Sequence, residues 1–240
     1  MSNYNFDGIE YPSVTTVLGI LDKPALVGWA AGLAVDWCIE NKARIDHPQF
    51  KHNAMNGWRD VSKQACDIGS EVHHIINNLH QGHDTQSERP EVQNAVLAHL
   101  DWEKQNAVTI EASEVPVHDK LLMFAGTLDA VAIIDGERCL IDYKTSKAVY
   151  NEYKYQVAAY ARAWDRMHQD KKIKRLFIVR LDKETGESEV VETTKTRRED
   201  EEVFKTILML YYQLAKRRLK GNYRAANRGA HDTEMTDAQM

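Results

Sequence analysis

Asp129, Asp142 and Lys144 are the residues of this sequence whose types and spacing could act together in chemistry. Asp135-Gly136 lies midway between the two aspartates, and an Asp-Gly pair flanked by alternating apolar residues is the strongest short-range signal for a β-hairpin. Counting outward from a two-residue loop, Asp129 faces Asp142 across the two strands. Their Cβ atoms are then expected about 4.5–5.5 Å apart.

Two carboxylates opposed in this way repel each other unless a cation lies between them. Mg²⁺ takes oxygen ligands from one or two carboxylates together with waters and substrate phosphate. Because side chains alternate along a strand, Lys144 falls on the same face as Asp142. A lysine in that place could orient a water bound to the metal and neutralise the charge that develops on a phosphate.

The Asp/Glu-x-Lys pattern alone has little weight, because it recurs at Glu40, Glu152 and Asp170. Those copies fall on expected helices or their exposed ends, where a solvated surface charge explains them. Only the copy at Asp142 closes an apolar strand opposite another aspartate. A surface salt bridge is the competing interpretation, and a three-residue loop would shift the pairing by one residue and break the opposition.

Apolar residues at helical spacing dominate the chain before residue 106. Ser13 is expected to cap a first short helix and Pro24 to open a second one. We expect a loop over Asp46–Gly57, a long helix from Trp58 to Leu79 and another from about Glu91 to Gln105. Residues 1–12 resemble a short extended arm.

From Ala107 onward the pattern changes to that of strands. The expected order is strands at 108–117, 127–134 and 138–144, a helix at 152–168, a hairpin of strands 175–181 and 187–193, and a last helix at 198–219. This order indicates an α+β or mixed α/β fold. We expect a helical part at 1–105, integrated with a sheet-containing core at 106–221, and a disordered tail at 222–240.

The bulk composition narrows the class of protein. With 240 residues and 43% hydrophobic content, the chain can bury the core of one sizeable domain, and its net charge of −5 neither suggests nor excludes nucleic acid. The three cysteines form no CxxC pair, which argues against a zinc ribbon or a disulfide framework. No apolar run is long enough for a membrane span, and the N-terminus lacks the pattern of a secretion signal. We therefore expect a cytoplasmic protein without a membrane partner.

Four short motifs occur together in a fixed order. They are Gly69-Ser70-Glu71-Val72-His73, Gly126-Thr127-Leu128-Asp129, Asp142-Tyr143-Lys144-Thr145 and Gln156-x-x-x-Tyr160, preceded by Pro12-Ser13-Val14-Thr15-Thr16 and Trp29. In these motifs the sequence resembles the RecB-like branch of the PD-(D/E)XK nuclease superfamily. That branch includes phage exonucleases, CRISPR adaptation nucleases and the mitochondrial genome maintenance exonuclease.

The resemblance implies a restriction-endonuclease-like mixed central sheet flanked by helices. It also implies that His73, Asp129, Asp142 and the backbone carbonyl of Tyr143 ligate a metal ion and that Lys144 is the catalytic lysine. Gln156 and Tyr160 would support the scissile phosphate or the lysine, and their i, i+4 spacing on a helix agrees.

Two residues keep alternative interpretations at this stage. From spacing alone, His73 near an apolar helix face would more often be a packed, hydrogen-bonded residue than a ligand, and only the resemblance favours ligation. Glu114 could support the metal ligands from the strand before the hairpin, but solvated strand polarity explains it equally well.

By this resemblance the protein is expected to be an Mg²⁺- or Mn²⁺-dependent DNA exonuclease in phage or bacterial recombination, replication or repair. DNA with free ends, including single strands, would be its substrate, and a single-strand annealing protein a partner. No iron–sulfur cluster is expected, since no group of cysteines follows Lys144. The alternatives are a structure-specific endonuclease, a non-catalytic DNA-binding recombination protein and a small-molecule hydrolase.

Residues that could contact DNA are less clearly marked. Basic clusters occur at Lys171–Arg175 and Lys216–Lys220, and solvated helix ends explain each as well as phosphate binding does. Trp29, Trp37, Trp58 and Tyr150 could stack on unpaired bases, although the tryptophans fall on expected core stripes.

Overall fold

The computed structural model describes residues 3–236, with side chains described from residue 4 to residue 216. It begins with an antiparallel hairpin of β1 (Asn3–Phe6) and β2 (Ile9–Pro12). Asp7 and Gly8 form its turn with positive φ angles of 54° and 78°. We expected only an extended arm here. Asp7-Gly8 is an Asp-Gly pair like the one in the central hairpin, and it forms the same kind of hairpin turn here.

A five-stranded sheet forms the centre of the molecule, in the order β3 (Thr109–Asp119), β4 (Phe124–Ile134), β5 (Glu137–Lys144), β6 (Arg175–Leu181) and β7 (Ser188–Glu192). All neighbours are antiparallel except β5 and β6, which are parallel. A parallel pair needs a crossover connection, and α5 (Asn151–Met167) supplies it. The expected mixed sheet is confirmed.

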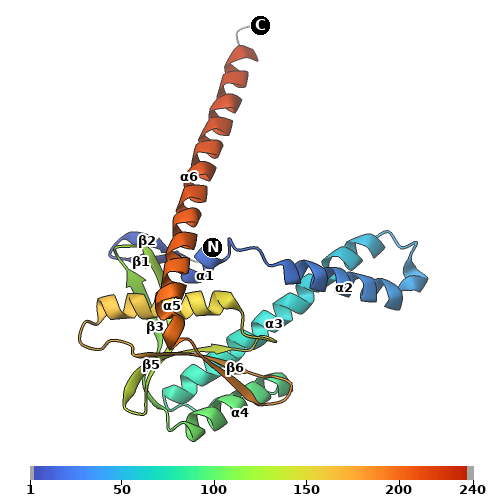
Figure 1. Cartoon of the computed structure of the whole chain (residues 1–240). Coiled ribbons are helices and arrows are strands. Elements are labelled where there is room, and N and C mark those ends of the chain that lie inside the picture. The colour runs from blue at the N-terminus through green and yellow to red at the C-terminus, as the bar shows by residue number, and fades with distance from the viewer. Residues whose placement is uncertain (1–2, 237–240) are drawn as a thin grey trace.

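Helices cover both faces of this sheet (Figure 1). The short α1 (Val14–Leu18), α5 and the first part of α6 (Arg197–Thr236) pack on one face around a core that includes Leu140 and Ile178. The long α3 (Phe50–His80) and α4 (Pro90–Gln105) pack on the other face around Ile141 and Tyr143. The sheet therefore separates two apolar clusters, and side chains that alternate along β5 enter one or the other.

The β4–β5 hairpin has the loop that the sequence predicts. Asp135 and Gly136 have φ angles of 53° and 78°, as a two-residue turn with two positive φ angles requires. Ile134 pairs with Glu137, and the ladder continues in that register to Ala130 and Ile141. The alternative three-residue loop is thereby excluded.

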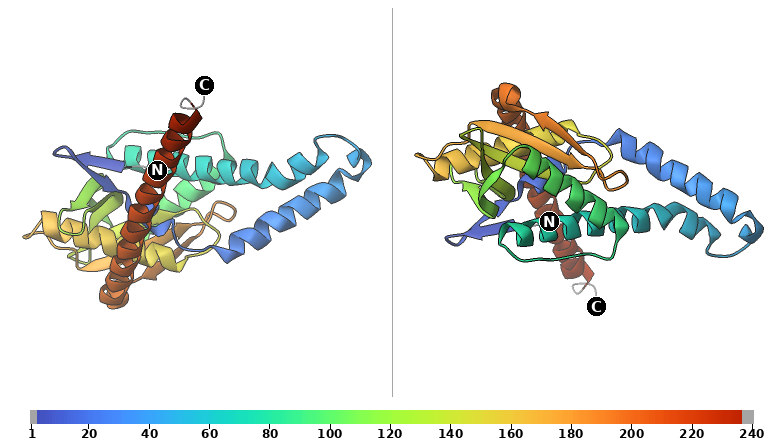
Figure 2. Two further views of the ribbon diagram at one scale, coloured as in Figure 1. Left: turned by 90° about the horizontal axis from the view of Figure 1, so that it is seen from above. Right: turned by 90° about the horizontal axis from the view of Figure 1, so that it is seen from below.

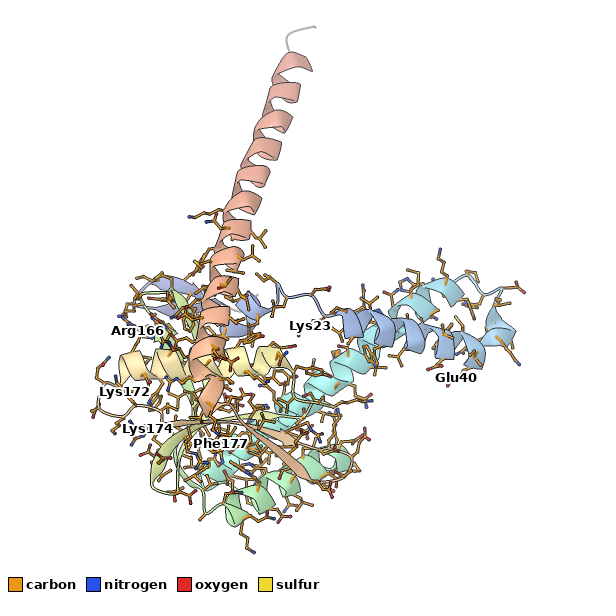
Figure 3. The ribbon with its side chains drawn as sticks, viewed as in Figure 1. Lys23, Glu40, Arg166, Lys172, Lys174 and Phe177 are labelled. Carbon is orange, nitrogen blue, oxygen red and sulfur yellow. The ribbon has the colours of Figure 1, made fainter. Side chains whose placement is uncertain are left out.

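An arm projects from this body (Figures 2 and 3). It consists of α2 (Pro24–Glu40), a short 3₁₀ helix (Lys42–Arg44) and the first half of α3. The expected loop over Asp46–Gly57 was wrong from Phe50 onward, where α3 begins. Phe50 packs on Trp37 with ring centroids 5.1 Å apart, so the contact between the two arm helices stabilises a helical turn that local sequence only weakly favours.

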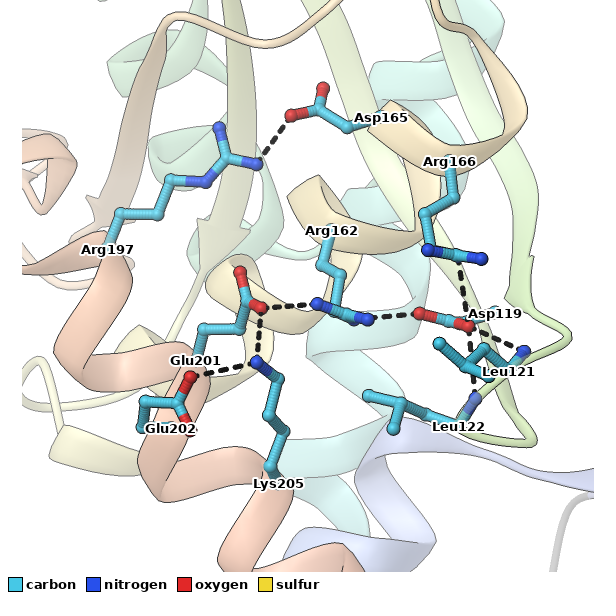
Figure 4. Close-up of polar contacts among 10 residues, drawn as sticks. All are labelled: Asp119, Leu121, Leu122, Arg162, Asp165, Arg166, Arg197, Glu201, Glu202 and Lys205. Carbon is cyan, nitrogen blue, oxygen red and sulfur yellow. Dashed lines mark hydrogen bonds and ion pairs between the residues drawn. The ribbon is translucent and has the colours of Figure 1, made fainter.

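The start of α6 is held to the body by ion pairs (Figure 4). Arg162 on α5 bridges the buried Asp119 at 2.8 Å and Glu201 at 2.6 Å, and Arg197 contacts Asp165 at 2.7 Å. The helix continues to Thr236 instead of ending near Gly221. The disordered tail expected at 222–240 stays a prediction, because its side chains and residues 237–240 lie outside the described part. No helix within residues 3–236 has the length and apolar character of a membrane span.

Candidate active site

Asp129 lies where the ladder between β4 and β5 ends. The last pair is Ala130 with Ile141, so Asp129 and Asp142 are the next residues outward, as the hairpin register predicts. The Tyr143 N–H donates a hydrogen bond of 2.8 Å to the Asp129 Oδ2 atom. Burial opposes ionisation of Asp129, but His73, Lys144 and this N–H outweigh it and hold the pKa of Asp129 below its ordinary value. Asp129 is therefore a carboxylate at neutral pH.

Asp142 and Lys144 form an ion pair on the α5 side of β5. The Lys144 Nζ atom lies 2.6 Å from Oδ2 of Asp142, whose side chain has no exposed surface. Burial, together with the charge of Asp129, raises the pKa of Asp142 to about 6, although Lys144 opposes that change. Burial likewise disfavours the charge on Lys144, but Asp142 and Asp129 outweigh it and raise the lysine pKa. Lys144 is thus a cation, suited to neutralising negative charge rather than to accepting a proton.

His73 approaches the same carboxylates from α3. Its Nδ1 atom lies 3.5 Å from Oδ1 of Asp129. Gly69, one turn earlier on α3, allows the chain that follows Lys144 to come close, because a Cβ at Gly69 would lie 3.2 Å from Oγ1 of Thr145. The glycine and the histidine of the helix motif therefore have separate tasks: close packing and contact with Asp129.

Glu114 joins this cluster, and it was not among the site residues that we predicted. Ser113 pairs with Ala130 and Val115 with Leu128, so Glu114 on β3 lies opposite Asp129. One potential ligand atom from each of His73, Glu114 and Asp129 lies within 4.8 Å of the others. Burial and the nearby Asp129 raise the pKa of Glu114.

The position of Glu114 depends on an irregularity in β3. The pairing of β3 with β4 shifts between Ile110 and Ala112, and Glu114 itself has a φ of 50°. A bulge re-aims the side chains that follow it. Alternation along β3 in the sequence gave no signal of this shift, and Glu114 could therefore not be separated from ordinary strand polarity.

Gln156 and Tyr160 are buried on α5, and the Gln156 amide donates a hydrogen bond of 3.3 Å to the Tyr160 hydroxyl. Burial and the charges of Asp142 and Asp129 raise the pKa of Tyr160 well above its ordinary value, so its phenol keeps the proton. The ring lies directly on Gly126, where an added Cβ would be 2.4 Å from Cε1 of Tyr160. This contact explains why a glycine precedes Asp129 in its motif.

A cavity of about 1250 Å³ opens beside the carboxylates. His73, Glu114, Asp129 and Lys144 line it. Its walls extend along the arm and over the loop after β5, and they include Leu26, Trp29, Val61, Lys147, Tyr150, Tyr153 and Lys183. Trp29 is therefore a wall residue and not part of a core stripe, in agreement with the absence of buried residues in α2 among those described.

The sequence pattern of the PD-(D/E)XK nuclease superfamily matches residues 90–231, which is more than half of the chain. The chain belongs to this superfamily. The sheet with helices on both faces is accordingly the restriction-endonuclease-like fold of the superfamily, and membership implies metal-dependent cleavage of nucleic acid, with DNA as the substrate.

The other comparisons add little. Among solved structures, the crystal structure of SSO0001 resembles the chain at 13% identity with a TM-score of 0.30, and the match covers 82% of each chain. A likeness of that size carries no conclusion about fold or function. No curated protein matches the chain.

The residues present fit the divalent metal that this superfamily uses. Within the described residues, neither oxygen of the fully buried Asp142 has a hydrogen-bond partner, and Lys144 forms its ion pair. A buried carboxylate of this kind is costly unless a cation or further donors satisfy it. Asp129, Glu114 and His73 supply two carboxylates and an imidazole beside it. Ligation by the Tyr143 carbonyl stays a prediction.

Proposed function

We propose that this protein is an Mg²⁺- or Mn²⁺-dependent exonuclease that hydrolyses phosphodiester bonds from free ends of DNA. The observation that carries the proposal is the pairing of the buried Asp142 with Lys144, because Lys144 and the nearby Asp129 both line a large cavity. We assign Asp129, Asp142 and His73 to metal binding, with the Tyr143 carbonyl, and add Glu114 to this group.

A divalent cation bound by these residues would polarise a phosphate oxygen and make water a better nucleophile. Lys144, a cation beside Asp142, would stabilise the negative charge that develops on the scissile phosphate. Gln156 holds the neutral phenol of Tyr160 by a hydrogen bond. This phenol can donate a hydrogen bond toward the acidic pair of Asp129 and Asp142. These three side chains are the catalytic and supporting residues that we propose beside the acidic pair.

The shape and lining of the cavity favour the binding of single-stranded DNA by a free end. Trp29 and Tyr150 offer aromatic faces, on which unpaired bases stack, and Lys147 and Lys183 offer charges for backbone phosphates. The arm of α2 and α3 forms one wall, so a strand end can be inserted between the arm and the body. We place the protein in the RecB-like branch on its motifs.

The experiment compares linear, end-labelled DNA with circular single-stranded DNA, in Mg²⁺, in Mn²⁺ and in chelator. Wild type should degrade linear DNA only, and only with metal. Asp142→Asn and Lys144→Ala should remove cleavage. Lys42→Ala is the matched control, because Glu40-x-Lys42 repeats the pattern at an exposed position outside the cavity lining. Cleavage of the circle would favour a structure-specific endonuclease, and binding without cleavage would favour a non-catalytic DNA-binding protein.

The biological setting is part of the proposal. We infer a role in phage or bacterial DNA recombination, replication or repair in the cytoplasm, together with a single-strand annealing protein. A direct test adds purified annealing protein with its DNA and measures association and cleavage rate. Neither association nor a change in rate would contradict this partner.

A further inference from the structure

A second cluster of metal-binding side-chain types lies on the other face of β5. His80 ends α3, while His99 and Glu103 lie one turn apart on α4. The exposed fractions of these side chains are 4%, 0% and 18% in that order. Tyr143 packs against them, since its side chain points away from the face of Asp142 and Lys144, into the cluster of α3 and α4.

The distances within this cluster match a tetrahedral metal site. His80 Nε2 lies 2.9 Å from Oε1 of Glu103, and His99 Nε2 lies 3.5 Å from Oε2. One potential ligand atom from each of the three residues lies within 4.8 Å of the others. Four ligands at the usual zinc distances of about 2.0–2.1 Å form a tetrahedron with edges of about 3.3 Å. Little rearrangement would be needed to admit the ion.

Hydrogen bonding alone leaves this cluster incomplete. Among the described residues, neither ring nitrogen of the fully buried His99 has a hydrogen-bond partner, and Nδ1 of His80 has none. A buried polar atom without a partner destabilises the folded protein. A hydrogen-bonded network built only for structure would be expected to satisfy His99, whereas a metal ion would use a lone pair of each imidazole.

We propose that His80, His99 and Glu103 bind a Zn²⁺ ion in a site separate from the nuclease centre. Two imidazoles and one carboxylate are a ligand set that zinc accepts. The Tyr143 hydroxyl, 3.2 Å from Oε1 of Glu103, lies where it can contact the fourth ligand or supply it. The ion links the end of α3 to α4 and fixes the position of Tyr143, which lies between Asp142 and Lys144. The site is structural, and its position beneath the catalytic strand links zinc binding to the rigidity of that strand.

The test uses the full chain, stripped of metal with chelator. Wild type titrated with Co²⁺ should show the visible absorption bands of a tetrahedral site, and Zn²⁺ should displace them. His73→Gln, which disables the other cluster, should still bind one equivalent of Zn²⁺ and show the bands. In that background, Glu103→Gln and His80→Gln should each lose the equivalent and the bands. His74→Gln, an exposed neighbour on α3, is the matched control and should change nothing.

A second readout guards against unfolded variants. Circular dichroism should show the same helix content in the stripped wild type and in Glu103→Gln, and Zn²⁺ should raise the melting temperature of wild type but not of the variant. Absence of the cobalt bands in His73→Gln would overturn the proposal. So would an equal rise in melting temperature for His73→Gln and for the same chain with Glu103→Gln added. None of these measurements depends on nuclease activity, so the two proposals can fail separately.

Discussion

Lys144 reaches the buried carboxylate of Asp142 at 2.6 Å, and the two residues are separated by only one position of the same strand. Their intervening neighbour, Tyr143, points to the opposite side of the sheet and donates its backbone N–H to Asp129. One strand therefore contributes a carboxylate, a cation and a positioning hydrogen bond. The contribution of each group to stability and to cleavage can be measured.

Removing the lysine should cost both stability and activity. Lys144→Met leaves the carboxylate of Asp142 buried without its cation, and the loss of one partner from a buried pair destabilises by about 3–5 kcal/mol. Asp142→Asn should cost less, and the double variant Asp142→Asn/Lys144→Met should recover part of the loss. Urea unfolding of metal-free protein measures all three. Equal destabilisation of the two single variants, with simple addition in the double variant, would show that the pair is not coupled.

Cleavage should fall in the same lysine variant even where the fold is kept. A group that stabilises developing charge in a site of this kind contributes about 10²–10³-fold to kcat. Lys144→Met should therefore lower kcat by that factor at saturating Mg²⁺. The control Lys42→Met, at the exposed Glu40-x-Lys42 copy of the pattern, should keep the wild-type rate. A normal kcat in Lys144→Met would remove the lysine from the mechanism.

Glu114 should prove to be a metal ligand or a direct support of one. Glu114→Gln keeps the shape and removes the charge next to Asp129 and His73, so metal affinity and cleavage should fall together, and raised Mn²⁺ should restore part of the rate. Glu111→Gln, on the same strand, breaks only an exposed pair with Arg138 and serves as the control. Isothermal titration with Mn²⁺ gives the affinities. Unchanged Mn²⁺ binding in Glu114→Gln would show that Glu114 is an ordinary polar residue of the strand with no part in metal binding.

Gly126 should not tolerate a methyl group. In Gly126→Ala the added Cβ would overlap the ring of Tyr160, and overpacking of a core costs about 1–3 kcal/mol. Displacement of Tyr160 should also lower kcat. Gly57→Ala is the matched control, because nothing lies within 4 Å of its Cβ position on α3. There the exchange should stabilise by about 0.5–1 kcal/mol. Thermal unfolding compares the two, and equal melting temperatures would refute the close contact.

Acid should weaken the attachment of α6 to the body. Burial raises the pKa of Glu201, but Lys205 and Arg162 outweigh it, so the folded-state pKa lies below its ordinary value (Figure 4). The unfolded chain then binds the proton more readily. Stability from this group is present above the ordinary glutamate pKa of about 4.3 and is lost as the pH falls through the lower folded value.

Arg162→Met should test that assignment. The variant should be less stable than wild type at pH 7. It should lose less further stability between pH 5 and pH 3, a range that spans the ordinary glutamate pKa of about 4.3. Urea unfolding across this range gives both numbers. Arg59→Met, which removes an exposed arginine beside Trp58 on the arm, is the control and should follow wild type. The same acid loss in Arg162→Met as in wild type would exclude the Arg162–Glu201 pair as its source.

Local sequence was sufficient for the centre of the site. Asp135-Gly136 can form only a narrow set of turns, and a two-residue turn fixes the register of both strands. The positions of Asp129 and Asp142, one step beyond the last pair of the ladder, therefore followed from counting. The spacing of Asp142 and Lys144 followed from alternation in the same way. Both are relations between residues close in the chain, which the backbone geometry alone determines.

Tertiary structure decided which residues from distant parts of the sequence join the centre of the site. Glu114 reaches Asp129 because of a strand irregularity, and Tyr160 fits because Gly126 lacks a side chain. Phe50 begins a helix because it packs on Trp37. His80, His99 and Glu103 come together only when two helices pack on one face of the sheet. Such contacts depend on side-chain packing between elements far apart in sequence, and no periodicity within one segment contains that information.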